Sequence, residues 1–227
     1  MDLDALISLE LDVPELLVGV VVAEGLALAH DPAVVDRLVE AALAPGAERG
    51  GEAVRAAVRD LLRLGGFKPT GRNKPASEYL AGAAERGAFP RINGVVDINN
   101  ALSLRTGWPM SVLDLDLMLG GAALAPGVFV VRWGRPGEAY VFNASGQELD
   151  LEGLLLVGRS GAGALGNPVK DAMAAKTSDG TRRIAAFIYG TRRATSVEAF
   201  ETCVASYANH VREGLGASSV FSTVLGR

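Results

Sequence analysis

The sequence has few of the residues that most often carry metal and redox chemistry. It contains one cysteine, Cys203, and two histidines, His30 and His210, which are far apart in the chain. A single cysteine excludes an intramolecular disulfide, and the acidic start MDLDALISLE lacks the basic region of a secretion signal, so we expect a cytoplasmic protein. Two distant histidines exclude a histidine-rich metal site and disfavour a Ser-His or Cys-His nucleophile. We therefore expect neither a metal nor another cofactor.

The chain also lacks a surplus of basic charge and a long apolar run. Lys plus Arg total 22 against 26 Asp plus Glu, which gives a net charge of −4. This balance argues against a protein that holds DNA or RNA mainly through phosphates, although brief contact with a nucleic-acid end stays compatible with it. The apolar run from Leu16 to Ala29 is interrupted by Glu24 and is too short to span a bilayer. We expect no DNA partner and no membrane partner.

What the sequence does contain is an alternation of strand and helix patterns. With 49% hydrophobic residues, it can bury a large core. The patterns predict strands at 4–12, 16–23, 128–133, 138–142, 152–157 and 183–189, and helices at 31–43, 51–64, 77–87, 94–106 and 196–213. We interpret residues 1–227 as a single mixed α/β domain, with an N-terminal lobe at about 1–66 and a pocket-bearing part at about 67–227.

Two predicted loops in this pattern have sequences that indicate a structure or a function. Residues 134–137, Gly-Arg-Pro-Gly, lie between two predicted strands and indicate a hairpin. Residues 159–179 are rich in Gly, Ala and Ser, and a long loop of small residues is often functional. Its segment 158–166, GRSGAGALG, lacks the Gly-Lys-Ser/Thr ending of a phosphate-binding loop and precedes no helical pattern, so we do not assign it that role.

The helix predicted at 94–106 is the element around which the chain is organised. Asn93 is its expected N-cap, and Gly107 with Pro109 should end it. Val95, Ile98 and Leu102 form one apolar stripe.

Another face of the same helix carries Asn93, Asp97 and Asn100 in place of the usual Lys and Glu. Short polar groups on a helix held against a core favour a lined pocket. The same residue types also serve as caps of helices and loops, and the residues alone leave both interpretations open.

Charged groups outside this helix have two interpretations each. The loop 67–75 carries Lys68, Arg72 and Lys74, which either point into solvent or meet a carboxylate or phosphate. Asp114 and Asp116 form either a turn or a weak metal site, and we favour the turn. No zinc-hydrolase, Cys-x-x-Cys or Gly-x-Ser-x-Gly motif is present.

Several segments together resemble a known family. They are FKPTGRNKPASEYL (67–80), PRINGVVDINNALSL (90–104), GWPMSVLDLD (107–116), Gly137-Glu138 and TSDGTRRIAAFIYG (177–190). In this order they resemble the B3/B4 domain of the phenylalanyl-tRNA synthetase beta subunit, in a freestanding form. The resemblance implies a mixed α+β fold with a β-sandwich-like core of unusual topology, packed helices and a pocket beside the central helix.

In the synthetase this domain is an editing module that hydrolyses the ester between tRNA and a wrongly attached, tyrosine-like amino acid. The resemblance implies that Asn99 and Asn100 are polar pocket residues. Two positions depart from the family pattern: Ser111 stands where the editing histidine is expected, and Phe187 aligns near the glutamate that reads the tyrosine hydroxyl. Neither histidine-dependent editing nor a preference for tyrosine follows for this chain.

Ester hydrolysis is still chemically accessible, because an aminoacyl ester is already activated and preorganised donors stabilise its oxyanion. We assign Asn99, Asn100 and Ser111 as candidate catalytic residues. Arg91 and Lys170 are candidates for holding a carboxylate or a terminal phosphate. The full set of candidate substrate-binding residues is Lys68, Lys74, Arg91, Asn93, Asp97, Glu138 and Lys170.

Three functional hypotheses follow. The first is a hydrolase that deacylates a mischarged aminoacyl-tRNA in trans, with the tRNA 3′ end as partner. The second is a non-catalytic module that binds a free amino acid or small carboxylate. The third is a subunit that contributes only surface to a larger assembly. Deacylation assays, ligand screening by thermal shift and size-exclusion mass distinguish them.

Overall fold

The computed structural model describes residues 1–226. The helices are α1 (Leu3–Leu6), α2 (Pro32–Leu43), α3 (Glu52–Arg63), α4 (Ala76–Glu85), α5 (Gly94–Thr106), α6 (Leu115–Leu119) and α7 (Val197–Leu215), with 3-10 turns η1 (Gly71–Asn73) and η2 (Met173–Ala175). The strands are β1 (Ile7–Leu9), β2 (Leu16–Glu24), β3 (Met110–Asp114), β4 (Phe129–Trp133), β5 (Ala139–Val141), β6 (Glu148–Asp150), β7 (Leu155–Arg159), β8 (Ala164–Gly166), β9 (Arg183–Thr191) and β10 (Ser219–Leu225).

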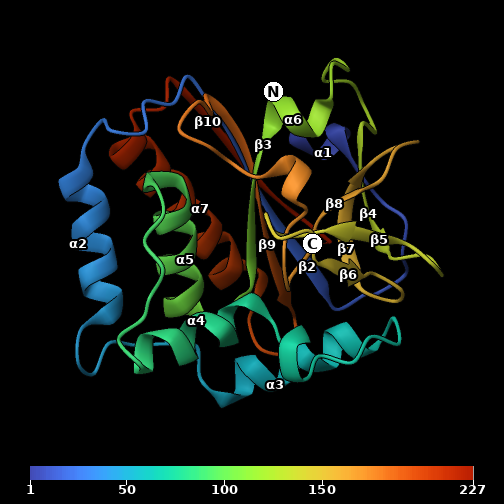
Figure 1. Ribbon diagram of the computed structural model, residues 1–227, viewed down its shortest axis with the longest axis horizontal. Coiled ribbons are helices and arrows are strands. Elements are labelled where there is room, and N and C mark those ends of the chain that lie inside the picture. Colours follow the sequence, from blue (N-terminus) through green and yellow to red (C-terminus); the bar gives the residue numbers. More distant parts are fainter. Residues whose placement is uncertain (227) are drawn as a thin grey trace.

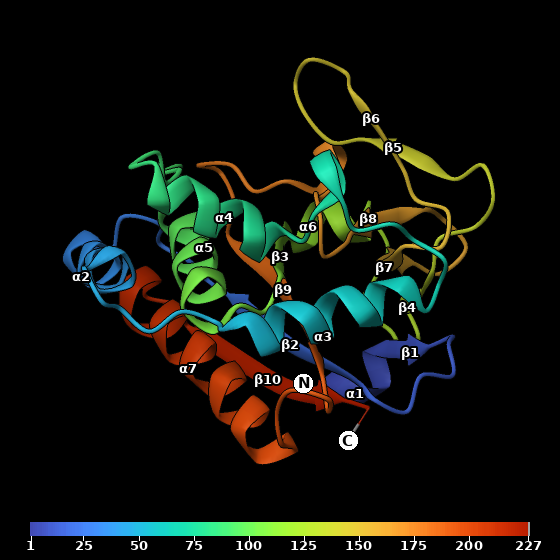
Figure 2. The ribbon, with the colours of Figure 1, turned by 90° about the horizontal axis from the view of Figure 1, so that it is seen from below.

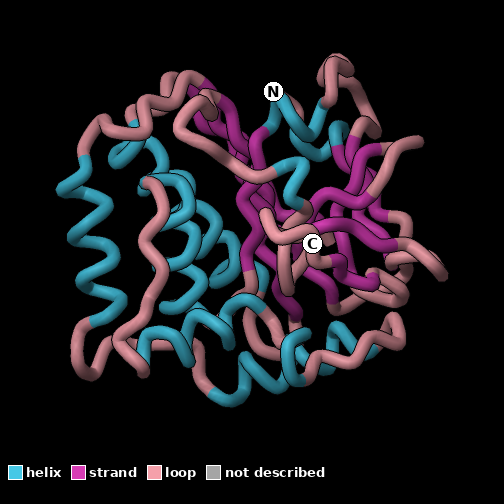
Figure 3. Tube along the Cα trace, in the orientation of Figure 1, coloured by secondary structure: helices cyan, strands magenta, loops and turns pink. Residues whose placement is uncertain are grey.

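These elements form two four-stranded sheets. The central sheet has the order β10-β2-β9-β3 with every pair antiparallel, and the second sheet has the order β1-β4-β7-β8. Helices α2, α5 and α7 lie on one side of the central sheet and the second sheet lies on the other (Figures 1 and 3). β2 is buried along nearly its whole length, as its continuous apolar run predicts for a strand covered on both faces. The expected mixed α+β class with a two-sheet core is confirmed.

Two glycines let α7 approach the central sheet closely. A Cβ at Gly19 would lie 2.4 Å from a methyl carbon of Val204, and a Cβ at Gly190 would lie 2.3 Å from the ring of Phe200. Such separations leave no room for a side chain, so both strands need glycine where the helix crosses them. The Phe200 ring then meets Trp108 edge to face, with the ring centroids 5.7 Å apart.

α5 begins and ends where its local signals predict. The Asn93 side chain accepts a hydrogen bond from the backbone N–H of Val96 at 3.0 Å. Gly107 ends the helix with a φ of 76°, a left-handed conformation that glycine adopts without strain. Val95, Ile98 and Leu102 are buried, which confirms the apolar stripe.

The predicted hairpin between 128–133 and 138–142 is wrong. Both edges of β4 are occupied, one by β1 in parallel and the other by β7 in antiparallel orientation. β5 therefore pairs with β6 in a separate two-stranded hairpin, which projects from the body of the molecule (Figure 2).

The structure differs from the predicted elements at four other places. Residues 4–12 contain the short helix α1 and only a three-residue strand, because Asp2 caps the helix by accepting from Ala5. Ser77 does not cap α4, which already begins at Ala76 after Pro75. The loop 159–179 contains β8 and η2, and β10 was not anticipated. Within residues 1–226, no helix is both long and apolar enough to cross a membrane.

Candidate functional site

A polar cluster is enclosed where β3, β8 and β9 meet. Ser111 on β3 has no exposed surface, and its Oγ lies 2.6 Å from Oδ1 of Asp171, 3.1 Å from the carbonyl oxygen of Asn167 and 3.2 Å from the Tyr189 hydroxyl. Serine carries one hydroxyl proton, and the shortest separation marks Asp171 as its acceptor. Tyr189 can then donate to Ser111, so the hydroxyl of Tyr189, the hydroxyl of Ser111 and the carboxylate of Asp171 form a chain.

Gly166 on β8 is what permits this close arrangement. A Cβ at this position would lie 2.9 Å from Oδ1 of Asp171 and 3.3 Å from Oγ of Ser111. The small-residue loop thus places a bare backbone against the serine and carboxylate pair, which a larger residue would push apart.

The carboxyl group of Asp171 has a pKa shifted toward neutral pH, as is common for groups at functional sites. Burial raises its pKa from the ordinary 3.8 to about 7, and hydrogen bonds from Ser111 and from the Asn167 N–H, with the nearby charge of Lys176, oppose this rise only in part. Asp171 keeps partial solvent exposure as a residue. A buried carboxyl group that titrates near neutral pH has a pKa suited to proton transfer.

Asn167 connects this cluster to Lys170. Its side-chain oxygen accepts from the backbone N–H groups of Val169 at 2.7 Å and Lys170 at 2.8 Å, and its side-chain nitrogen donates to the Tyr140 hydroxyl. Tyr140 in turn donates to the carbonyl oxygen of Lys170 at 2.6 Å, and burial raises the pKa of its phenol. The turn that carries Lys170 and Asp171 is therefore held from both sides.

Asn99 supports the cluster from the helix side. It is buried, donates to the carbonyl oxygen of Met110 at 3.4 Å and accepts from the Tyr207 hydroxyl at 3.3 Å. These contacts fix β3 one residue before Ser111. Asn100, one position further along α5, is half-buried, and no hydrogen bond within residues 1–226 involves its side chain.

Two other predicted residues, Arg91 and Asp97, lie together at the start of α5. Arg91 donates to Asp97 at 2.7 Å and to Asp36 at 2.6 Å, and both hydrogen bonds raise its pKa. Asp97 is buried and also accepts from the backbone N–H of Ile92. Arg91 thus already binds two carboxylates of its own chain.

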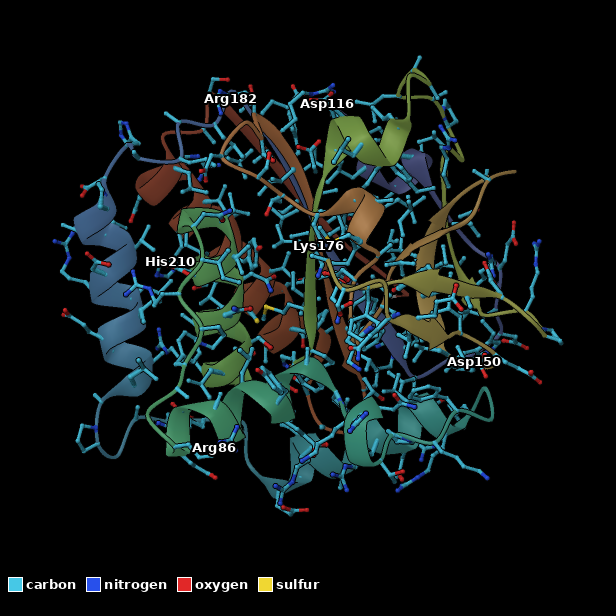
Figure 4. All side chains as sticks on the ribbon, viewed as in Figure 1. Arg86, Asp116, Asp150, Lys176, Arg182 and His210 are labelled. Carbon is cyan, nitrogen blue, oxygen red and sulfur yellow. The ribbon has the colours of Figure 1, made fainter. Side chains whose placement is uncertain are left out.

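An open pocket of about 640 Å³ lies at the same end of α5. His30, Asp179 and Arg182 bring charged or polar groups to its wall, and of the predicted site residues only Asn93 lines it. Figure 4 shows Arg182 at the edge of the molecule, and Lys176 near the centre of the view where the 159–179 segment crosses β3. The pocket and the polar cluster are therefore separate places.

The remaining predicted residues are dispersed. Glu138 binds the largely buried Arg132 through two hydrogen bonds of 2.6 and 2.8 Å. Lys68 and Lys74 are exposed on the loop that contains η1. Asp114 caps α6 and accepts from Thr181, while Asp116 pairs with Arg183. No group of three or more His, Cys, Asp or Glu residues suited to a metal occurs in the described part of the chain.

Sequence reasoning missed most of the residues that form hydrogen bonds with Ser111, Asn99 and each other in the polar cluster. Asp171, Asn167, Tyr140, Tyr189 and Tyr207 were not among the candidates, although they carry most of the cluster's hydrogen bonds. One signal was present: a tyrosine inside an otherwise apolar strand, as in RIAAFIY, needs a partner for its hydroxyl.

The chain belongs to the B3/4 domain family, whose model matches residues 68–209. That range contains every residue of the polar cluster. Among known proteins, similar segments occur in phenylalanine–tRNA ligase beta subunits. That of Synechococcus sp. (strain CC9605) is 35% identical over 71 residues, 30% of this chain and 9% of the relative. That of Nitrosospira multiformis is 35% identical over 80 residues, 35% of this chain and 10% of the relative.

A third relative gives the same result. The phenylalanine–tRNA ligase beta subunit of Ralstonia nicotianae is 37% identical over 60 residues, 26% of this chain and 7% of the relative. The matched segments thus span a tenth or less of each relative's length.

Proposed function

We propose that this protein hydrolyses the ester bond of an aminoacyl-tRNA in trans. The observation that carries the proposal is the family match over 68–209, because this range includes both the cluster around Asp171 and the residues that hold it. The relatives are named as beta subunits of phenylalanine–tRNA ligase, a protein that acts on tRNA and an amino acid. An aminoacyl-tRNA is the substrate that joins these two molecules through an activated ester.

Asp171 is the proposed general base. In its ionised form it takes a proton from a water molecule, whose oxygen attacks the ester carbonyl carbon. The ester C–O bond to the ribose then breaks, and the ribose oxygen takes the proton. The products are a free amino acid and a tRNA with a free terminal hydroxyl. A base of pKa about 7 is half ionised at neutral pH, which suits it to this transfer.

Ser111 acts as a positioning residue in this scheme. It has no exposed surface, and it contacts the carboxyl group of Asp171, which is also buried although the residue as a whole is partly exposed. Its O–H fixes the carboxylate through the 2.6 Å hydrogen bond. Asn99 holds β3 in place, and Asn100, with an uncommitted amide, is the proposed donor to the oxyanion.

The test is deacylation of a panel of correctly charged and mischarged aminoacyl-tRNAs by the purified protein. We expect hydrolysis above the spontaneous rate for at least one substrate, with kcat/KM rising with pH through about 7, the pKa of Asp171. Asp171→Asn should remove this rise. Spontaneous rates for every member of the panel, at all pH values, would rule out the proposal.

The open pocket at the start of α5 favours a second candidate function, the binding of a free amino acid or small carboxylate. Arg182 supplies a cation at its wall, and the first turn of α5 supplies backbone N–H groups. A ligand present at 100 times its Kd stabilises the fold by about 2.7 kcal/mol. A thermal-shift screen of amino acids should find such a ligand, and Arg182→Gln should abolish its shift. A screen without any shift would exclude this function.

A further inference from the structure

The turn 178–182 brings two opposite charges to the wall of the open pocket at the start of α5. Asp179 and Arg182 both line this pocket, and both are exposed. Within residues 1–226, neither side chain forms an ion pair, with the other or with any third residue. The guanidinium group of Arg182 donates instead to the backbone carbonyl oxygens of Asp179 at 3.0 Å and Thr181 at 2.9 Å. A carboxylate and a guanidinium group three residues apart therefore both keep their charge for a ligand.

Hydrogen bonds hold the backbone that carries these two charges. The Thr181 N–H donates to the Ser178 carbonyl oxygen at 3.0 Å, and the Ser178 N–H donates to the Thr181 hydroxyl at 2.9 Å. The Thr181 hydroxyl donates in turn to the buried Asp114 at 2.7 Å. The Arg182 carbonyl oxygen accepts from the Leu26 N–H at 3.0 Å. Because the turn is already ordered, a ligand that binds both charges pays little to order the chain.

The rest of the pocket wall is largely apolar. Its apolar members are Leu26, Ala27, Leu28, Ala29 and Ile92. The Ile92 residue is 67% exposed, although its backbone N–H is held by Asp97 at 2.8 Å. An apolar side chain fixed at the mouth of a pocket offers contact area to an apolar group of a ligand. The volume of about 640 Å³ lies in the range of about 300 to 1,000 Å³ that is usual for small-molecule sites.

We propose that this pocket binds a free α-amino acid with a large apolar side chain, as a zwitterion. Asp179 accepts from the ammonium group of the ligand, Arg182 donates to its carboxylate, and its side chain lies against Ile92. An α-amino acid carries both charged groups on one carbon atom, so it can bridge two protein charges that lie on one short turn. Charge-assisted hydrogen bonds of this kind are about twice as strong as neutral ones. The inference rests on the second candidate function and narrows its ligand class, since a simple carboxylate would leave Asp179 unpaired.

The test is isothermal titration calorimetry with L-leucine and L-phenylalanine. Each is compared with an analogue that lacks the ammonium group, isocaproate or hydrocinnamate, and with one that lacks the carboxylate, isoamylamine or phenethylamine. We expect at least one of the two amino acids to bind about tenfold or more tighter than both of its analogues, because a hydrogen bond to a charged group contributes about 1.5 to 3 kcal/mol. L-serine, which has both charges and no apolar side chain, should also bind more weakly.

Two variants separate the two charges. Asp179→Asn should weaken binding of the amino acid about tenfold or more and leave its carboxylate analogue within twofold. Arg182→Gln should weaken the amino acid to a similar extent and leave its amine analogue within twofold. Asp150→Asn and Arg86→Gln are the matched controls, because they remove the same charges at exposed residues that Figure 4 shows well away from Arg182. Both controls should bind the amino acid as the wild type does.

Equal affinities for an amino acid and its carboxylate analogue would overturn the inference and leave the binding of small carboxylates standing. Binding of an amino acid that neither Asp179→Asn nor Arg182→Gln weakens would place the ligand elsewhere and would overturn it too. If no ligand gives heat or a thermal shift, the inference and the second candidate function both fail. The hydrolase proposal is independent of these outcomes, because deacylation is measured with a different substrate.

Discussion

Ser111 and Phe187 lie directly opposite each other in the antiparallel strands β3 and β9, and neither has any exposed surface. Side chains of opposed residues share one face of the sheet. These are the two positions at which the sequence departs from the pattern of the family it resembles. A hydroxyl and a hydrocarbon ring stand there, and the acid of this region is instead Asp171, which follows Ser111 by 60 residues. The chemistry of the site is therefore predicted to depend on Asp171.

Replacing Asp171 with asparagine tests that dependence. Asn keeps an oxygen that accepts from Ser111 and from the Asn167 N–H, but it does not take a proton from water. We expect kcat/KM for deacylation to fall by about 10²- to 10⁴-fold, the usual contribution of a general base. Far-ultraviolet circular dichroism should show an unchanged fold. Activity within twofold of the wild type would contradict the role of Asp171.

Ser111→Ala should move the pH profile while leaving a base in place. The hydrogen bond from Ser111 lowers the pKa of Asp171, so its removal lets burial raise that pKa further. We expect the midpoint of the kcat/KM profile to shift to higher pH than in the wild type. Thr, which keeps a hydroxyl, is the matched control. An unchanged midpoint in the alanine variant would show that the serine hydroxyl does not contact the titrating group.

The stability of the protein should depend on pH through the same carboxyl group. Its folded pKa of about 7 lies above the ordinary 3.8, so the folded state binds the proton more tightly than the unfolded state. The stability from this group is fully present below pH 3.8 and is lost progressively as the pH rises from there to about 7. At about 1.4 kcal/mol per pH unit, the loss amounts to about 4 kcal/mol.

Urea denaturation of the wild type and Asp171→Asn at pH 5 and pH 8 measures the part of this loss that falls above pH 5. The difference between the two proteins isolates Asp171 from the other titrating groups. We expect the wild type to lose more stability than the variant between these pH values. Parallel behaviour of the two proteins would mean that Asp171 is ionised throughout.

Gly166→Ala should destabilise the fold and disturb the site. The added methyl group would lie 2.9 Å from Asp171 Oδ1 and from a methyl carbon of Leu113, and overpacking of this kind costs about 1 to 3 kcal/mol. Gly163→Ala is the matched control, because a Cβ there meets nothing within 4 Å. Chemical denaturation of both variants provides the comparison. Equal stabilities would show that the strand can yield at Gly166.

Glu138→Gln should reduce stability through Arg132. The Arg132 side chain is only 8% exposed, and removing one partner of a buried ion pair costs about 3 to 5 kcal/mol. The hydrogen bond from Arg132 lowers the pKa of Glu138, so the stability from this pair should be lost as the pH falls below the ordinary value of 4.5. Glu152→Gln, at an exposed position, is the control. A rise in KM without loss of stability would instead assign Glu138 to substrate binding.

Local signals in the sequence were enough to define the ends of α5 and the start of α7. The cap at Asn93 and the glycine at Gly107 fix both ends of α5 through contacts within four residues, and such contacts are readable from the chain. Ser196 likewise caps α7 as predicted. Strand pairing is different, because it depends on which edges are already occupied. The hairpin at 134–137 failed for that reason: β4 has partners on both sides.

The site was predictable only in part, for the same physical reason. Ser111 and Asn99 lie in a recognisable motif, but Asp171 acquires its properties from burial and from a hydroxyl that the fold brings to it. Arg91 and Asp97 were predicted as substrate contacts, and the structure shows them bound to each other. Their roles toward a substrate, and the division of the chain into two lobes, stay predictions.

The strand order of the central sheet has a consequence for dissecting the protein. The family match at 68–209 includes β3 and β9 but excludes β2 and β10, which complete the same sheet. A fragment trimmed to the matched range would leave one side of β9 without its hydrogen-bonding neighbour. Bare strand edges recruit other chains, so such a fragment should precipitate. During synthesis, too, the sheet stays unfinished until residues 219–225 have left the ribosome.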